Sequence, residues 1–155
     1  MTDRSLLSRI RQEIENLTPY IATCKEAVDT NSGKPPSVIS QLSRYNYQTM
    51  LEILNQETDS DVSVEKGREN AMREALHSYL MQYAPGEKDL AGYITAISLY
   101  LTFYAKRPLH PPDLVTDDFR IEKRDDEYYC TGKNRYLHDE PSLCRFCVCK
   151  PYIPE

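Results

Sequence analysis

Four of the five cysteines lie close together near the end of the chain, at Cys130, Cys144, Cys147 and Cys149. Two residues separate Cys144 from Cys147, a spacing at which one tight turn directs both sulfurs to the same tetrahedral ion. A hairpin that ends at Cys130 would bring a third sulfur to this turn. The pattern therefore predicts a metal site on Cys130, Cys144 and Cys147, with zinc about 2.3 Å from each thiolate.

The residues leave the fourth ligand open. Cys149 is near in sequence, but a Cys-x-Cys pair on one tetrahedral ion strains the backbone more than the Cys-x2-Cys step does. His138 lies inside the loop that the site would close, and His110 lies where the last predicted helix gives way to extended chain. An imidazole completes many three-cysteine zinc sites, whereas a water molecule in that position would leave the metal open for catalysis.

Iron–sulfur clusters and free thiols are the two alternatives to zinc. Four thiolates also hold iron–sulfur clusters, but the Cys-x-Cys step does not match the common ferredoxin spacing, so zinc is favoured. Free thiols that pack as small apolar groups are the second alternative, and the clustering of four cysteines argues against it. The fifth cysteine, Cys24, is far away in sequence and is expected in the helical core.

Residues 1–106 are predicted to be helical. Apolar residues recur three or four positions apart, as on one face of a helix, in the segments 6–17, 20–28, 38–54, 72–83 and 90–105. The last segment carries no charged residue, and a helix that is apolar nearly all round belongs at the centre of a bundle. Short connections between consecutive helices favour an antiparallel arrangement of neighbouring helices. The predicted fold is all-α, an antiparallel bundle of about five helices.

Residues 107–155 are predicted to form a small Cys-rich extension that packs on this bundle. The segment holds six of the ten prolines and four of the five cysteines. Between 118 and 130, Phe119 and Ile121 alternate with charged residues, a turn follows at 124–126, and the chain returns to Cys130, which predicts a short β-hairpin. With so little apolar sequence to bury, the extension needs a metal as a crosslink.

Composition excludes several classes of protein. With 155 residues, of which 40% are hydrophobic and 28% charged, the chain is long and apolar enough for a core, which excludes collagen-like and mostly disordered proteins. The net charge of -5 disfavours a globally basic nucleic-acid or membrane-surface protein. The first residues are polar, and the longest uncharged run is too short to cross a bilayer. We therefore expect a cytoplasmic protein, and its oligomeric state is left open.

Three strings in the last third of the chain resemble a known family. They are Pro108-Leu-His-Pro-Pro112, Tyr128-Tyr-Cys130 and Leu143-Cys-Arg-Phe-Cys147. The segment resembles the domain-of-unknown-function family 2115, uncharacterised proteins mostly from methanogenic archaea. The resemblance implies an archaeal protein from an anaerobic cytoplasm, which keeps the iron–sulfur alternative open, and it implies no activity.

The chain departs from the family pattern at two positions. The family tends to have proline where this chain has Thr131, and it usually lacks a cysteine at the position of Cys149. The second departure puts Cys149 in doubt as the fourth ligand. It points instead to His110, which lies in the Pro-Leu-His-Pro string.

The leading functional hypothesis is a binding or adaptor module with a structural metal and an unidentified protein partner. One alternative is a metalloenzyme or redox protein that uses an open position on the same metal. Another is a single-stranded RNA-binding protein, since aromatic and basic residues alternate in the tail. Five acidic residues between 125 and 140 would repel a phosphate backbone, so nucleic acid is the less favoured partner. No catalytic residue is assigned, because the chain has neither a G-x-S-x-G elbow nor a phosphate-binding glycine loop.

Overall fold

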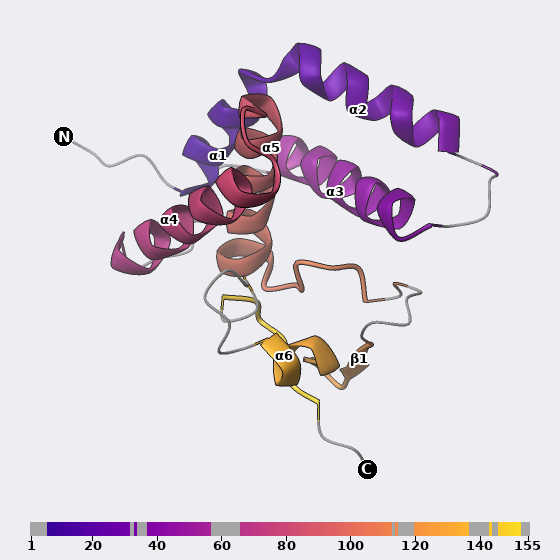
Figure 1. The fold of residues 1–155 in the computed structure, drawn as a ribbon, viewed down its shortest axis with the longest axis vertical. Helices are drawn as coiled ribbons and strands as arrows, with labels where there is room; N and C mark the ends of the chain where they lie inside the picture. The colour runs from indigo at the N-terminus through magenta and orange to yellow at the C-terminus, as the bar shows by residue number, and fades with distance from the viewer. Residues whose placement is uncertain are drawn as a thin grey trace.

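The computed structural model describes residues 6–31, 33, 37–56, 66–112, 114, 120–136, 143 and 146–152. Over these residues the protein is mostly helical, and a small sheet lies near the C-terminus (Figure 1). The helices are α1 (Leu6–Glu15), α2 (Thr18–Asn31), α3 (Val38–Asn55), α4 (Lys66–Tyr83), α5 (Lys88–Leu99), the π-helix η1 (Tyr100–Ala105) and α6 (Thr131–Tyr136). The strands are β1 (Ile121–Arg124), β2 (Glu127–Cys130) and β3 (Lys150–Pro151).

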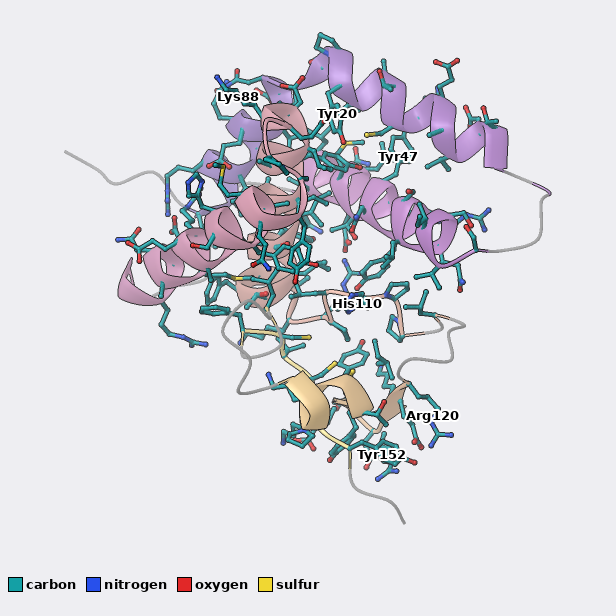
Figure 2. All side chains as sticks on the ribbon, in the orientation of Figure 1. Tyr20, Tyr47, Lys88, His110, Arg120 and Tyr152 are labelled. Atoms are coloured by element: carbon teal, nitrogen blue, oxygen red, sulfur yellow. The ribbon has the colours of Figure 1, made fainter. Side chains whose placement is uncertain are left out.

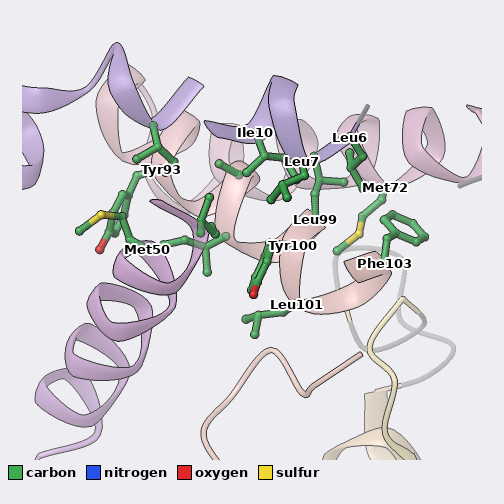
Figure 3. Close-up of a cluster of buried hydrophobic side chains, with 14 of the residues drawn as sticks. Leu6, Leu7, Ile10, Met50, Met72, Tyr93, Leu99, Tyr100, Leu101 and Phe103 are labelled. Atoms are coloured by element: carbon green, nitrogen blue, oxygen red, sulfur yellow. The ribbon is translucent and has the colours of Figure 1, made fainter. Parts of the chain in front are cut away.

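Helix α5 and its continuation η1, which carry no charged residue from Leu90 to Ala105, lie in the middle of the helical part. Helices α1, α3 and α4 all contact α5, and α2 packs on α3 (Figure 1). The core joins the apolar stripe of α1 to Met72 and Leu76 of α4 and to buried residues of η1 such as Tyr100 and Phe103 (Figure 3). The mostly helical fold is confirmed, whereas the antiparallel bundle and the division at residue 106 stay predictions.

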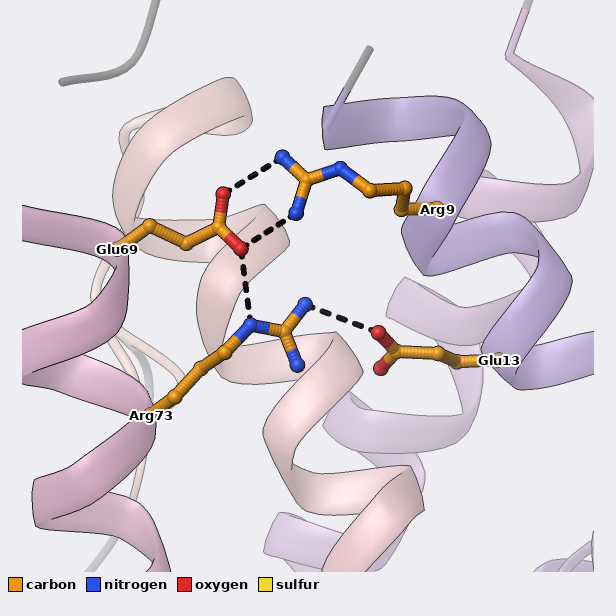
Figure 4. A network of polar contacts seen from close by, with 4 residues as sticks. All are labelled: Arg9, Glu13, Glu69 and Arg73. Atoms are coloured by element: carbon orange, nitrogen blue, oxygen red, sulfur yellow. Dashed lines mark hydrogen bonds and ion pairs between the residues drawn. The ribbon is translucent and has the colours of Figure 1, made fainter. Parts of the chain in front are cut away.

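A network of four charged side chains fastens α4 to α1 (Figure 4). Both terminal nitrogens of Arg9 donate to the carboxylate of Glu69, each at 2.6 Å. Arg73 donates to Glu69 at 2.9 Å and to Glu13 on α1 at 2.9 Å. Because only 5% of the Glu69 side chain is exposed, water cannot solvate this charge, and the two arginines take over that role.

The end of η1 turns the chain away from the helices. Lys106 has a left-handed backbone conformation, with φ at 55°, and the N–H of Arg107 donates to the carbonyl of Leu101 at 2.9 Å. Helices cannot continue through a left-handed residue, so η1 ends here, and residues 107–112 form a non-helical linker with bends at 109–110. This linker carries His110, which Figure 2 places between the helices and the sheet.

The C-terminal sheet has the strand order β1-β2-β3. Strands β1 and β2 form the antiparallel hairpin that the sequence predicts, with Ile121 opposite Cys130 and a two-residue turn at Asp125 and Asp126. Strand β3 and helix α6 were not predicted, because β3 is two residues long and α6 has six residues without an apolar stripe. Strand β3 runs parallel to β2 and places Pro151 beside Cys130.

Within the described ranges, none of the helices is both long enough and apolar enough to cross a bilayer. Phe119, part of the predicted hairpin, lies outside the described residues.

Candidate metal centre

The hairpin and the last strand bring Cys130 and Cys149 together. Cys130 is the final residue of β2, and Cys149 comes directly before β3, which pairs with β2. Strand residues alternate between two faces, so Ile121, directly opposite Cys130, points to the same side as this sulfur. Cys130, Cys149 and Ile121 form a small buried cluster against which Cys147 and Tyr128 pack.

The thiol of Cys149 is the centre of this cluster. It lies within hydrogen-bonding reach of the sulfurs of both Cys130 and Cys147. These hydrogen bonds and burial raise the pKa of Cys149, so Cys149 keeps its proton as the donor. A hydrogen bond from the Cys149 thiol lowers the pKa of the sulfur that accepts it, to about 6 for Cys147 and to about 7 for Cys130, although burial opposes both shifts. Cys149 has a single proton, so it donates to one of the two sulfurs at a time. At neutral pH Cys147 is therefore mostly a thiolate, and Cys130 is about half ionised.

Main-chain N–H groups also stabilise both thiolates. Cys130 accepts from the amides of Gly132 and Lys133 in the first turn of α6, and Cys147 accepts from the amides of Cys149 and Leu109. The Lys133 ammonium donates to the carbonyl of Cys147 at 2.9 Å, and its charge further lowers the Cys147 pKa. Hydrogen bonds of this kind orient thiolate ligands and balance their charge in metal–sulfur sites.

Cys130, Cys147 and Cys149 are thus predicted ligands that the structure brings together. Cys144 and His138 lie outside the described residues. Among the residues that are described, no group of three or more His, Cys, Asp or Glu side chains has the arrangement of a metal-binding site.

His110 lies in the linker next to Leu109, whose amide contacts Cys147, so its backbone is close to the cluster. Burial lowers the pKa of His110, and it is the sole cause of that shift. The three cysteines, in contrast, shift one another's pKa values. Cys149, one of the groups considered for the fourth position, contacts the other two described sulfurs.

Tyr45 connects this cluster to the helical part. Its hydroxyl, on α3, donates to the carbonyl of Pro108 in the linker at 2.6 Å. Burial raises the pKa of Tyr45, and the nearby thiols of Cys147 and Cys149 add to the shift. Leu109 and Phe146 pack against the main hydrophobic core from the C-terminal side.

Sequence reasoning missed Tyr45, Lys133 and the amide of Leu109. In the sequence Tyr45 is one more apolar residue on the stripe of its helix, Lys133 is one of many lysines, and a main-chain N–H carries no sequence signal. Only the approach of α3 and the linker to the cysteines reveals the contribution of these groups.

Comparison with known proteins decides the family. The model of the family DUF2115, described as "Uncharacterized protein conserved in archaea", matches residues 2–151. The chain belongs to this family. A UPF0305 protein of Methanocaldococcus jannaschii is 30% identical over 97% of this chain and 96% of its own length. A UPF0305 protein of Methanothermobacter thermautotrophicus is 36% identical over 34% of this chain and 32% of its own length. No solved structure is significantly similar.

The match to the DUF2115 model covers both the helices and the Cys-rich segment. The resemblance that the sequence motifs indicated was strong only over the last third of the chain. The departure at Thr131 has a structural consequence in this member. The Thr131 amide donates to the Arg120 carbonyl at 3.0 Å, and its hydroxyl accepts from the Arg120 amide at 2.8 Å. A proline here lacks the N–H and the hydroxyl, so it could form neither of these bonds at the base of the hairpin.

Proposed function

We propose that this DUF2115 protein binds one zinc ion through Cys130, Cys144, Cys147 and Cys149, and that the ion has a structural role. The observation that supports the proposal is the cluster of Cys130, Cys147 and Cys149, with two main-chain N–H groups directed at each of the outer sulfurs. Four thiolates around one tetrahedral ion are a common structural zinc site. The proposal prefers Cys149 to His110 as the fourth ligand.

The burial of the cluster supports a structural role over a catalytic one. Cys130 is 8% exposed and Cys149 is 3% exposed, and Tyr128 packs against them. A catalytic zinc keeps one open position for water or substrate, whereas a structural zinc is closed by protein ligands. Zinc at this place would crosslink the hairpin to the end of the chain, and neither segment has a large apolar core of its own.

The wider function that we propose is a cytoplasmic binding or adaptor module that acts on a protein partner. In this proposal the metal holds the C-terminal segment in a fixed shape on the helices, so that a partner meets a preformed surface.

Metal analysis of protein purified without oxygen tests the zinc site. We expect one zinc per chain, and we expect Cys130→Ser, Cys147→Ser and Cys149→Ser each to lose most of it. Cys24→Ser is the matched control, because Cys24 lies on α2 and belongs to the helical core, and this variant should keep its zinc. Iron with acid-labile sulfide in place of zinc, or full zinc binding in all three cluster variants, would refute the proposal.

A further inference from the structure

The outer face of the C-terminal sheet carries a different set of side chains from the face that holds the sulfurs. Alternation along β1 places Arg120, Glu122 and Arg124 on the side opposite to Ile121. The register of the sheet adds residues from the other strands to this outer face: Glu127, Tyr129, Lys150 and Tyr152. The outer face therefore has three cationic and two anionic side chains in a protein whose net charge is -5.

Two guanidinium groups are held in place over one aromatic ring. The guanidinium carbons of Arg120 and Arg124 lie 5.0 Å and 5.1 Å from the centre of the Tyr152 ring. Arg124 also lies 5.2 Å from the ring centre of Tyr129, and Arg120 donates to the Tyr152 hydroxyl. Contacts of this kind reduce the freedom of long side chains, so less entropy is lost when the two cations bind an anion.

A shallow hollow of about 340 Å³ lies between these groups and is lined by Arg120, Ile121, Glu122, Arg124 and Tyr152. Figure 2 shows Arg120 and Tyr152 beside each other at the end of the molecule away from α2. This volume is at the small end of the range of ligand sites, about 300–1,000 Å³.

Glu122 already occupies part of this hollow as an internal anion. Its carboxylate accepts from Arg124 at 3.2 Å and lies 3.8 Å from Arg120. The arrangement shows that a carboxylate fits between the two guanidiniums. A phosphate group carries more charge and more acceptor oxygens than a carboxylate, so it competes well for the same donors.

We propose that this outer face binds the phosphate of a nucleotide between Arg120 and Arg124, while the base stacks on the planar groups around Tyr152. Aromatic rings and guanidinium planes are the surfaces on which proteins stack unpaired bases. The nucleotide comes either from a free mononucleotide or from single-stranded RNA, since both offer the same phosphate and base. The proposal depends on the fold of the sheet, and it does not depend on which metal the sulfurs bind.

Binding of three probes to the full-length protein tests this site. The probes are adenosine monophosphate, a single-stranded oligoadenylate of about ten nucleotides, and inorganic phosphate, each titrated by calorimetry at low salt. We expect Arg120→Gln and Arg124→Gln each to weaken nucleotide binding about tenfold, because each removes charge-assisted hydrogen bonds. Glu122→Gln should tighten binding severalfold, because it removes the competing carboxylate.

Lys123→Gln is the matched control, since it changes the net charge by the same amount on the opposite face of the strand, where Lys123 lies over Tyr128. We expect this variant to change nucleotide affinity by less than about twofold. With two phosphate contacts, oligoadenylate affinity should fall about sevenfold between about 50 and 200 mM salt. Saturation by the mononucleotide identifies a free nucleotide as the source, and measurable binding of the oligoadenylate alone identifies RNA.

Three outcomes would overturn the nucleotide site. The first is that no probe binds at low salt, and the second is that Arg124→Gln and Lys123→Gln have equal affinity for every probe. The third is equal affinity for phosphate and adenosine monophosphate, because the base would then contribute nothing. Zinc content measured on the same variants separates this result from a failure of the metal site, since none of these substitutions removes a sulfur.

Discussion

At the scale of single residues, the main feature is the contact among three cysteines that shift one another's pKa values. The pKa of Cys149 is raised and those of Cys130 and Cys147 are lowered, so the two outer sulfurs lose their protons more readily and become better metal ligands. The amides of Leu109, Gly132 and Lys133 contribute through their position alone. The reactivity of these sulfurs therefore depends on main-chain amides that cannot be identified from the positions of the cysteines in the sequence.

The lowered pKa of Cys147 predicts an unusual pH profile of alkylation in the metal-free protein. The rate at Cys147 should be half-maximal near pH 6 and should level off above about pH 7, because its pKa is about 6. The rate at Cys24 should still be rising at pH 9, because burial raises the pKa of that thiol above its ordinary value of 9.0. Mass spectrometry after timed exposure to iodoacetamide measures both rates in one sample. An inflection for Cys147 near pH 8.5 would contradict the described cluster.

At the scale of secondary-structure elements, ionic and hydrogen-bonded contacts determine how the helices and the linker meet. Glu69 on α4 binds Arg9 on α1, and Tyr45 on α3 binds the carbonyl of Pro108. Apolar stripes bring helices together but tolerate sliding, because dispersion and the hydrophobic effect have little directionality. Directional contacts such as these select one arrangement.

The Glu69 network predicts a pH-dependent contribution to stability. Hydrogen bonds from Arg9 lower the pKa of Glu69 below its ordinary value of 4.5, so the carboxylate stabilises the fold above that pH. The contribution is lost as the pH falls through the folded-state pKa. We expect Glu69→Gln to reduce the free energy of unfolding in urea by about 1–3 kcal/mol at pH 7, and by progressively less below pH 4.5.

Glu74→Gln is the control for this measurement, because Glu74 lies on the same helix with its side chain exposed. It should change stability by less than about 0.5 kcal/mol. An equal loss in the two variants at pH 7 would show that the network has no special role.

At the scale of the whole molecule, the helices and the C-terminal segment are stabilised by different means. The helical part has a continuous hydrophobic core, whereas the sheet has a small cluster in which two of the three buried residues are cysteines. Leu109 and Phe146 join the two parts by packing against the main core. If zinc binds the sulfurs, its removal should loosen the sheet and leave the helices largely intact.

Limited proteolysis with and without a chelator tests this expectation. Metal removal should expose new cleavage sites after residue 107, while the fragment from α1 to η1 survives, because binding energy at a metal site is folding energy for the segment around it. Cys147→Ser should behave like the chelated protein without any chelator. An unchanged cleavage pattern in both cases would mean that no metal stabilises this region.

Local patterns in the sequence were enough to predict several helices, the hairpin and the family of this protein. The apolar spacing in 6–17 and 90–105 predicted buried helices, and the alternation around Ile121 predicted the hairpin, because burial follows the periods of helix and strand. The three strings near the C-terminus indicated the family, which the match over residues 2–151 confirms. The spacing of the cysteines also predicted that several of their side chains lie close together near the C-terminus.

The tertiary structure alone decided which of these groups meet. It placed Cys149 against the other two described sulfurs, and it brought Tyr45, Lys133 and the Leu109 amide to the same place. Strand β3 is too short to leave a pattern, yet its pairing with β2 sets the position of Cys149. Contacts between residues so far apart in sequence depend on the final packing of all the elements, and no periodicity within one element encodes them.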